Sequence, residues 1–353
     1  MPRFRPEVLL EIGCELFVAA GCTPSDARTV VDHLVESNLF GHDSHGVIRY
    51  PEYMRAIREG RYQARADPEV VQDTPCTAVV DARGALGQIG AHFATELAIE
   101  KAQKQGVASV SLRNTCHIGR VGAYPLMAAR AGTMAQVFAN GGHFGGQVVP
   151  FGGIDGRLCT DPLAFAAPRR EADPILLDMT TSVVAEGKVR VASYRGEEVP
   201  QGWLIDSEGY PTRDPKAFRA DPPGSILPLG GVAAHKGYGM AFMVELLGGS
   251  LSGQGCTRGA PVVASNGVLL TVHHIESFTD LETYYDEVES LLEHVRSSRL
   301  APGFEEILVP GEPEFRSARQ RQSTGIEVDD KTWSMIREEL QHFGINSEHW
   351  KPE

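Results

Sequence analysis

The sequence predicts an α/β fold, and three features of the chain indicate it. Strand-like apolar runs alternate with helix-like segments between residues 77 and 139, an order typical of strands packed under helices. Helices are expected near both chain ends, with apolar residues at helical spacing over 6–20, further helices up to residue 59, and a closing helix over 330–343. Residues 140–235 combine many glycines and prolines with short apolar runs, which predicts several strands that are not all parallel.

The first elements are expected to be three helices. The apolar spacing over 6–20 predicts the first. Thr23 and Pro24 supply an N-cap and a proline at the first helical position, so a second helix is expected as far as about Leu39. A third helix is expected over 50–59, where a glycine follows.

The following segments alternate between patterns typical of strands and the spacing of three to four residues typical of helices. Strands are predicted at 77–81, 107–112, 134–139 and 267–272, and helices at 91–105, 121–131, 237–252, 279–297 and 330–343. The stretch 299–325 is expected to be mostly loop. No linker is evident, and we expect one domain to comprise 1–115 with 300–353 and the other to comprise 116–299.

Composition excludes several classes of partner. The chain has 353 residues, a formal net charge of −13 and a pI near 5.4. An acidic surface repels nucleic acid and anionic lipid, so neither is an expected partner. The N-terminus has no signal-peptide pattern, and no apolar run approaches a bilayer span. Six cysteines show no CxxC pair, which is typical of reduced thiols in a cytoplasmic protein.

The segment Gly41–Gly46 (GHDSHG) is the first candidate for a functional site. Arg49 and Tyr53 follow it at a spacing that places both on one face of the next helix. Arg grips a carboxylate through two hydrogen bonds, and His exchanges a proton near neutral pH, so His45 with Arg49 suits oxo-acid chemistry. The alternative is a helix-capping turn with a solvated histidine. A Ser44–His45 nucleophile pair is disfavoured, because adjacent residues rarely face each other and no oxyanion-hole motif follows.

A second histidine, His117, follows a predicted strand in the segment NTCHIGRVGAY. Active-site groups of α/β folds gather at such strand ends, although a single histidine there is often structural. Cys116 has no separate base beside it and is interpreted as a packed thiol. No set of ligands with characteristic metal spacing is present, so no metal is expected.

The glycine-rich stretches do not match G-x-G-x-x-G, so an ordinary Rossmann site is not supported. Two other segments carry polar groups of interest. A predicted strand, ILLDM, ends in Asp178 and hydroxyl residues. Lys236 precedes Gly237 at the start of an apolar helix, where backbone N–H groups attract phosphate. The alternative for Lys236 is a solvated surface lysine.

Taken in order, five segments resemble the malate/L-lactate dehydrogenase family, which lacks a Rossmann fold. They are GHDSHGVIRYPEYMRAIREG, NTCHIGRVGAY, ILLDMTTSVVAEGK, AHKGYGMAFMVELLGGSLSG and LVPGEPE. The resemblance spans nearly the whole chain, and several motifs in the right order are specific where one would not be. The family includes ureidoglycolate and sulfolactate dehydrogenases and diketogulonate reductase. The sequence is most similar to the hydroxycarboxylate dehydrogenases.

The resemblance implies a fold and a set of site residues. The fold is a mixed, largely antiparallel sheet in the cofactor domain, 116–299, with a helical substrate domain built from both chain ends. It also implies a homodimer with the active site between domains. The implied acid/base residues are His117, as first choice, and His45, and the substrate-binding residues are Ser44, Arg49 and Tyr53. The implied cofactor-binding residues are Asn140, Asp178, Met179, Thr180, Thr181, Lys236, Gly237, Gly311 and Glu312.

The implied reaction is hydride transfer between NAD or NADP and a small 2-hydroxy acid or its 2-oxo acid. Reduction of a cyclic imino acid by the same machinery, or a non-catalytic binding protein with this fold, remains an alternative. Two departures concern the cofactor pocket. Relatives usually have Gly-Thr-Asn-Pro where this chain has Cys159-Thr160-Asp161-Pro162, and a small or apolar residue where it has Glu186.

Overall fold

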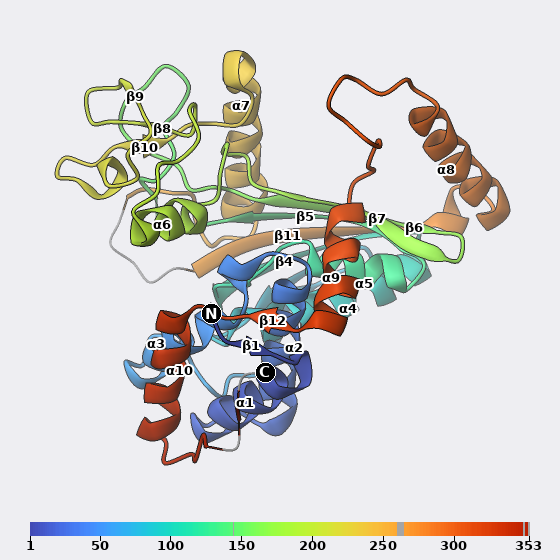
Figure 1. Cartoon of the computed structure of the whole chain (residues 1–353). Helices are drawn as coiled ribbons and strands as arrows, with labels where there is room; N and C mark the ends of the chain where they lie inside the picture. Colours follow the sequence, from blue (N-terminus) through green and yellow to red (C-terminus); the bar gives the residue numbers. More distant parts are fainter. Residues whose placement is uncertain (144, 260–264, 349, 352–353) are drawn as a thin grey trace.

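A seven-stranded sheet forms the centre of the described part of the chain (Figure 1). The structure is a computed structural model, which describes residues 1–143, 145–259, 265–348 and 350–351. The strand order is β2-β3-β4-β11-β5-β6-β7. These strands are β2 (Glu69–Asp73), β3 (Thr77–Asp81), β4 (Val107–Cys116), β5 (Thr133–Asn140), β6 (Leu163–Arg169), β7 (Ala172–Met179) and β11 (Ser265–His274).

Strand pairing is antiparallel throughout this sheet except between β3 and β4. The prediction of a mixed, largely antiparallel sheet is therefore confirmed. Strand β4 continues beyond the predicted end at 112 as far as Cys116, so that His117 follows its last residue directly. The sheet takes strands from both sides of residue 115, and the predicted division of the chain into two domains stays a prediction.

Two helices, α4 (Gly87–Gln105) and α5 (Ala123–Arg130), pack against the sheet. Helix α4 turns a row of alanines toward the strands, namely Ala91, Ala94, Ala98 and Ala102. Their spacing of three or four residues places them on one helix face. The small side chains let the helix approach the sheet closely, over a core of valines and leucines from β3, β4, β5 and β11. This packing holds the carboxyl end of β4 in place.

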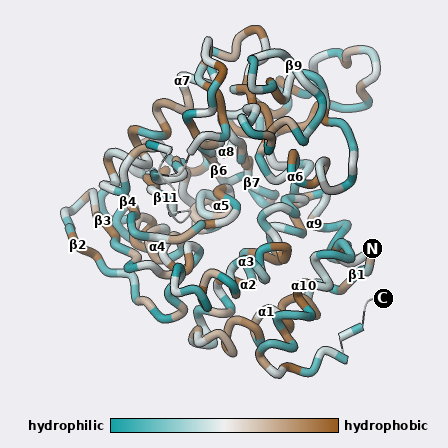
Figure 2. Tube along the Cα trace, turned by 90° about the vertical axis from the view of Figure 1, so that its left-hand side faces the viewer, coloured by the Kyte–Doolittle hydropathy of each residue, from teal (hydrophilic) through white to brown (hydrophobic). Residues whose placement is uncertain are grey.

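Both chain ends build one helical body beside the sheet. Figure 2 shows its helices together, and they are α1 (Pro6–Ala19), α2 (Pro24–Leu39), α3 (Tyr50–Arg58) and α10 (Asp330–His342). Strands β1 (Arg3–Phe4) and β12 (Ile326–Glu327) pair and join the two ends. One buried core spans them, because residues from Phe4 to Tyr62 pack with residues from Ile326 to Trp350. The predicted Thr23 cap is confirmed, since its side chain accepts the Asp26 N–H.

Two helices were not predicted. Helix α9 (Glu312–Thr324) lies within the stretch expected to be loop. Its polar sequence buries Phe315, which packs edge-on against Phe40 of the segment after α2. Helix α6 (Glu186–Arg195) lies within the region expected to hold strands, and Gly196 ends it in the left-handed conformation. Both helices contact the site described below.

The remaining elements surround the sheet. The predicted helix at 237–252 is α7 (Ala234–Val244), which continues as a π-helix, η5 (Glu245–Ser250). Helix α8 (Leu281–Arg296) matches its predicted range closely. A small sheet comprises β8 (Leu204–Ile205), β9 (Pro211–Thr212) and β10 (Ser225–Ile226). Short 3-10 helices are η1 (Asp43–His45), η2 (Val47–Arg49), η3 (Ala217–Arg219), η4 (Gly231–Ala233) and η6 (Ile275–Ser277).

Candidate active site

The loop that carries Ser44 and His45 is clamped from both chain ends. The Asn38 side chain donates to Asp43 Oδ1 at 2.6 Å, and its oxygen accepts the N–H of residue 47 at 2.8 Å. Arg321 of α9 also donates to Asp43 Oδ1, at 2.6 Å. A Cβ atom on Gly46 would lie 2.1 Å from the Asn38 amide oxygen, so the glycine is required for this close approach.

The two predicted acid/base residues come together. The rings of His45 and His117 stack with centroids 5.5 Å apart and planes inclined by 20°. The Ser44 hydroxyl lies 3.1 Å from Nδ1 of His45. Residues that are 72 positions apart in the sequence thus form one histidine pair, with the Nδ1 atom of His45 engaged by a neighbouring hydroxyl.

Tyr53 and Gln88 hold the second histidine. The Tyr53 hydroxyl lies 2.7 Å from Nδ1 of His117, and the Gln88 side chain donates to the same hydroxyl at 3.1 Å. All of Tyr53 is buried. With Nδ1 engaged, Nε2 is the nitrogen of His117 that remains for a substrate.

The backbone around His117 is fixed by close packing. A Cβ atom on Gly87, the first residue of α4, would lie 2.2 Å from the His117 carbonyl oxygen. The N–H of Ile118 donates to the Asn266 side chain at 2.9 Å, and Asn266 in turn donates to the Asn140 carbonyl at 2.7 Å. The loop after β4 is therefore held against both α4 and the neighbouring strands.

Burial keeps both histidines neutral in the free protein. Burial, followed by the charge of Arg49, lowers the pKa of His117 to about 3. Burial, followed by the proximity of His117 and Arg49, holds the pKa of His45 well below its ordinary value. Because two adjacent imidazolium ions repel each other, the pair favours at most one proton.

Arg49 lies beside the pair with part of its guanidinium already occupied. Its Nε donates to the Ser44 carbonyl at 2.8 Å, and one terminal nitrogen donates to Glu52 at 2.6 Å. Arg49 and Glu52 differ in exposure, with 13% and 45% of their side chains exposed. The ion pair holds the pKa of Glu52 below its ordinary value against the opposing effect of burial. The other terminal nitrogen of Arg49 makes no hydrogen bond within the described residues, so it is available to an incoming carboxylate.

The predicted cofactor residues at the end of β7 form a second group. Asp178 accepts the Gly122 N–H at 3.0 Å and lies 3.7 Å from the buried guanidinium of Arg120. Thr180 donates to the Ser182 carbonyl, Thr181 donates to the Thr160 carbonyl, and Met179 ends the strand.

Helix α7 is joined to this group through one backbone segment. The Thr181 carbonyl accepts the Leu229 N–H at 2.9 Å, and a Cβ on Gly237 would lie 2.2 Å from the Leu229 carbonyl oxygen. The structure thus brings Gly237 near the end of β7. Lys236 is exposed on the first turn of α7, and no ion pair involves it in the described ranges.

The other three predicted cofactor residues are Asn140, Gly311 and Glu312. Asn140 is fully buried, and its side chain bonds Glu245, Gly142 and the main chain at 255 and 267. Gly311 has a φ of 97°, and it packs its backbone against Leu176 in the middle of β7. Glu312 follows at the start of α9, where its carboxylate pairs with Arg296 and accepts the N–H of residue 309.

The two departures from the family pattern have local explanations. Burial, and after it the neighbouring Glu245 carboxylate, raise the pKa of Asp161 well above its ordinary value. A protonated Asp161 is neutral like the asparagine that relatives usually have there. Glu186, at the first position of α6, pairs with Arg219 at 3.1 Å.

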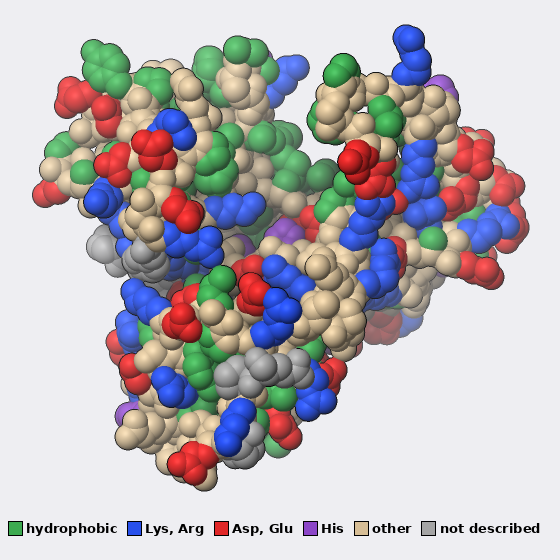
Figure 3. Space-filling model, in the orientation of Figure 1, with side chains coloured by type: hydrophobic (Ala, Val, Ile, Leu, Met, Phe, Trp, Pro, Cys, Tyr) green, Lys and Arg blue, Asp and Glu red, His purple; other side chains and the backbone are tan. Residues whose placement is uncertain are grey.

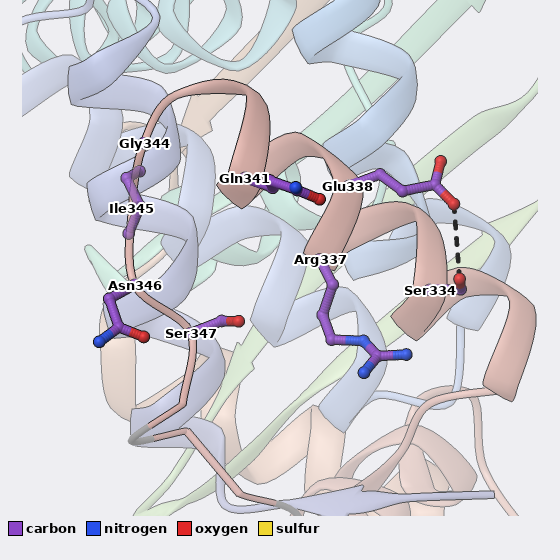
Figure 4. Close-up of a pocket in the computed structure, with 8 residues that line it drawn as sticks. All are labelled: Ser334, Arg337, Glu338, Gln341, Gly344, Ile345, Asn346 and Ser347. Carbon is purple, nitrogen blue, oxygen red and sulfur yellow. Dashed lines mark hydrogen bonds between the residues drawn. The ribbon is translucent and has the colours of Figure 1, made fainter.

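Two surface hollows lie apart from the histidine pair. One is bounded by α10 and the turn after it, and Figure 4 shows its polar lining, in which Ser334 contacts Glu338. The other lies between the β6–β7 hairpin and α9, and includes Glu312 with Arg169, Arg316 and Arg319. Neither is lined by the histidine pair. Within the described residues, no group of three His, Cys, Asp or Glu could hold a metal, and no helix is long and apolar enough to cross a membrane.

Several residues of this site were not singled out from the sequence. Gln88 lies in a glycine-rich stretch that resembled an ordinary turn. Glu52 lies one helical turn from Arg49, and that spacing is a signal that could have found it. Asn266 and Arg190 meet the site only through the tertiary fold, so no local pattern marks them.

Comparison with known proteins gives consistent matches over the whole chain. A family model described as malate/L-lactate dehydrogenase matches residues 4–337. Hydroxycarboxylate dehydrogenase B of Escherichia coli K12 is 36% identical over 352 residues, which cover 98% of this chain and 96% of that protein. The solved structure of sulfolactate dehydrogenase from Methanocaldococcus jannaschii has a TM-score of 0.88 at 32% identity and covers 99% of both chains.

A further solved structure is that of delta1-piperideine-2-carboxylate reductase from Pseudomonas syringae, with a TM-score of 0.82 at 27% identity, covering 96% of this chain and 100% of that one. The fold, the site and these matches define an oxidoreductase that acts on 2-hydroxy acids. The chain belongs to the malate/L-lactate dehydrogenase family. The family resemblance predicted from the motifs is confirmed.

Proposed function

We propose that this protein is an NAD- or NADP-dependent dehydrogenase that interconverts a small 2-hydroxy acid, of the malate, lactate or hydroxycarboxylate type, with its 2-oxo acid. The observation that carries the proposal is the stacked pair of His45 and His117 beside the partly free guanidinium of Arg49. A cation for a carboxylate and an imidazole for a proton are the two groups that this reaction needs from the protein.

Arg49 binds the substrate carboxylate and thereby orients the carbon that reacts. Ser44 and Tyr53 line the same pocket through their contacts with the two histidines. Holding the reactant in one orientation supplies much of the rate enhancement. The carboxylate also brings a negative charge next to the histidine pair, which favours a protonated imidazole there.

His117 is our first choice for the residue that gives the proton to the substrate oxygen from Nε2 during reduction and takes it back during oxidation. Tyr53 engages Nδ1 and so keeps Nε2 directed at the pocket. A positioned general acid contributes about 10²–10⁴-fold to a rate. His45 is the second choice, since Ser44 engages its Nδ1 and leaves its Nε2 for a substrate among the described residues.

The residues at the end of β7 and the start of α7 fit a nicotinamide cofactor. Half-buried Asp178, Met179 and Thr180 offer a carboxylate and a hydroxyl suited to ribose, and exposed Lys236 beside Gly237 suits a phosphate. Thr181 is buried and is proposed to hold this turn through its bond to the Thr160 carbonyl. The cofactor supplies the hydride, or accepts it, when bound. We propose that Asn140 acts from its buried position by holding Asn266 and the loop after β4. The Gly311–Glu312 turn is proposed to complete the site.

We propose a homodimer in the cytoplasm. Helix α7 and the segment after it expose several large apolar side chains, at Phe242, Met243, Leu246 and Leu251. A face of this kind is typical of a surface that another protein covers. The six cysteines are free, which suits a reducing compartment. Light scattering with Phe242→Glu tests the dimer, and a monomeric wild-type protein would contradict it.

A spectrophotometric screen of 2-oxo acids with NADH and NADPH tests the proposed function. We expect oxidation of one cofactor with at least one 2-oxo acid.

The second candidate is reduction of a cyclic imino acid, which the piperideine-2-carboxylate reductase structure favours. Side-by-side assays with delta1-piperideine-2-carboxylate separate the two. A protein that binds neither cofactor in calorimetry would instead be a non-catalytic binding protein.

A further inference from the structure

Helix α6 brings a second arginine to the candidate active site. A Cβ atom on Gly187 would lie 2.8 Å from Ser44 Cβ, so the first turn of α6 packs directly on the loop of the histidine pair. Arg190 lies three residues further along the same helix and therefore on the same face. Its side chain is half-buried.

Two carboxylates of these elements are already paired with other arginines and not with Arg190. Arg49 is paired with Glu52, and Glu186 is paired with Arg219. Arg190 has no carboxylate within ion-pair distance among the residues that the structure describes. On the face drawn in Figure 3, Lys and Arg side chains gather where the part of the molecule that holds α6, β8, β9 and β10 meets the helical body of α1, α2, α3 and α10.

The electrostatic effect of Arg190 reaches the reacting groups. Burial opposes ionisation of Glu52, but the charge of Arg49 and, more weakly, that of Arg190 hold its pKa below the ordinary value. Arg190 also contributes, after burial, Arg49 and His33, to the low pKa of His117. The charges of two arginines from different parts of the fold thus act on one site, and one carboxylate, that of Glu52, is paired with the first of them, Arg49.

We propose that Arg190 binds a second anionic group of the substrate, so that the preferred substrates are 2-oxo dicarboxylates and their 2-hydroxy forms. Arg49 holds the carboxylate next to the reacting carbon, and Arg190 holds the carboxylate at the other end. A monocarboxylate would leave the half-buried Arg190 without its counter-charge. This assignment rests on the proposed function and names its substrate class.

Oxaloacetate and 2-oxobutyrate test this assignment, because a carboxylate in the first replaces a methyl group in the second. We expect the wild-type protein to show a higher kcat/KM for oxaloacetate. Arg190→Ala should lower kcat/KM for oxaloacetate by about 30-fold or more and for 2-oxobutyrate by less than about threefold. Arg190→Lys should recover only part of the loss, since an ammonium cannot form the two-bond contact.

Controls separate this role from a structural one. Arg195→Ala removes an exposed arginine from the last turn of α6 and should leave the ratio of the two substrates unchanged. Equal losses for both substrates in Arg190→Ala, or a raised KM for the cofactor alone, would overturn the assignment. Equal use of both substrates by the wild-type protein would also overturn it. Failure of the proposed function would look different, because the wild-type protein would then reduce neither oxo acid.

Discussion

The Tyr53 hydroxyl lies 2.7 Å from Nδ1 of His117, and the buried Gln88 donates to that hydroxyl from the other side. These two linked hydrogen bonds determine which nitrogen of His117 faces the pocket. His45 lacks such a buried chain, since its Nδ1 contacts only the neighbouring Ser44 hydroxyl in the described structure. The difference in support is our reason for ranking His117 first as the acid/base residue.

His117→Ala should lower kcat by about 10²-fold or more while cofactor affinity stays near the wild-type value, because a general acid contributes in that range. Steady-state kinetics and a cofactor titration measure the two effects. His92→Ala, at a position of α4 where the side chain is 45% exposed, serves as the control and should be neutral. If His45→Ala abolishes turnover and His117→Ala does not, the two roles are reversed.

Tyr53→Phe tests the positioning of His117. Loss of a hydrogen bond to a group that becomes charged costs about 1.5–3 kcal/mol, so kcat should fall roughly 10- to 100-fold. The pH profile of kcat should move as well, because Nδ1 loses its partner. Tyr50→Phe removes a buried hydroxyl on the same helix that bonds the Leu9 carbonyl 3.1 Å away. That control should alter stability alone, and a matching loss of kcat there would argue for a purely structural effect.

Sequence reasoning located the motifs but not their environment. It predicted Thr23 as a helix cap because capping depends on local hydrogen bonds, and the structure has that cap. Helix α9 was missed because its sequence, EPEFRSARQRQST, has almost no apolar periodicity, and burial of Phe315 against Phe40 is a tertiary effect. Helix α6 was missed because the region around it combines many glycines and prolines with short apolar runs. Its packing on Ser44, which places Arg190, followed from no local pattern.

Arg49→Ala should act through the substrate. Removal of the charged contact from the remaining terminal nitrogen should cost about 2–5 kcal/mol in kcat/KM, and Arg49→Lys should not restore it fully because an ammonium cannot keep the bonds to Ser44 and Glu52 while it binds the substrate. Arg55→Ala changes an exposed arginine of α3 and should leave kcat/KM unaltered. Unchanged kcat/KM in Arg49→Ala would remove Arg49 from the pocket.

Asp161→Asn should stabilise the protein at neutral and alkaline pH. Burial raises the pKa of Asp161 well above its ordinary value, so the native state keeps a proton that the unfolded chain releases above about pH 4. Stability is therefore fully present below that pH and is lost as pH rises toward the native pKa, by up to about 1.4 kcal/mol per pH unit. Asparagine is neutral at every pH and avoids this loss.

Urea unfolding at pH 5 and pH 8 measures the effect. The gain from Asp161→Asn should be larger at pH 8 than at pH 5. The exposed Asp155 pairs with Arg157 on the surface, and Asp155→Asn should give no such gain. A gain that is the same at both pH values would show that Asp161 is ionised in the native state.

Lys236→Ala should weaken cofactor binding and leave the oxo acid unaffected. Lys236 lies exposed on the first turn of α7, where free backbone N–H groups and the helix dipole already favour an anion. Its ammonium adds a local cation to a protein whose net charge of −13 otherwise repels phosphate. We expect the cofactor Kd to rise roughly tenfold at low salt, and the difference from wild type to shrink at high salt because ions screen the charge.

Lys104→Ala, which removes a lysine from the far end of α4, should change neither the cofactor Kd nor its salt dependence. A cofactor Kd within twofold of wild type at low salt would mean that Lys236 is a solvated surface residue, since the loss of such a residue costs under about 0.5 kcal/mol.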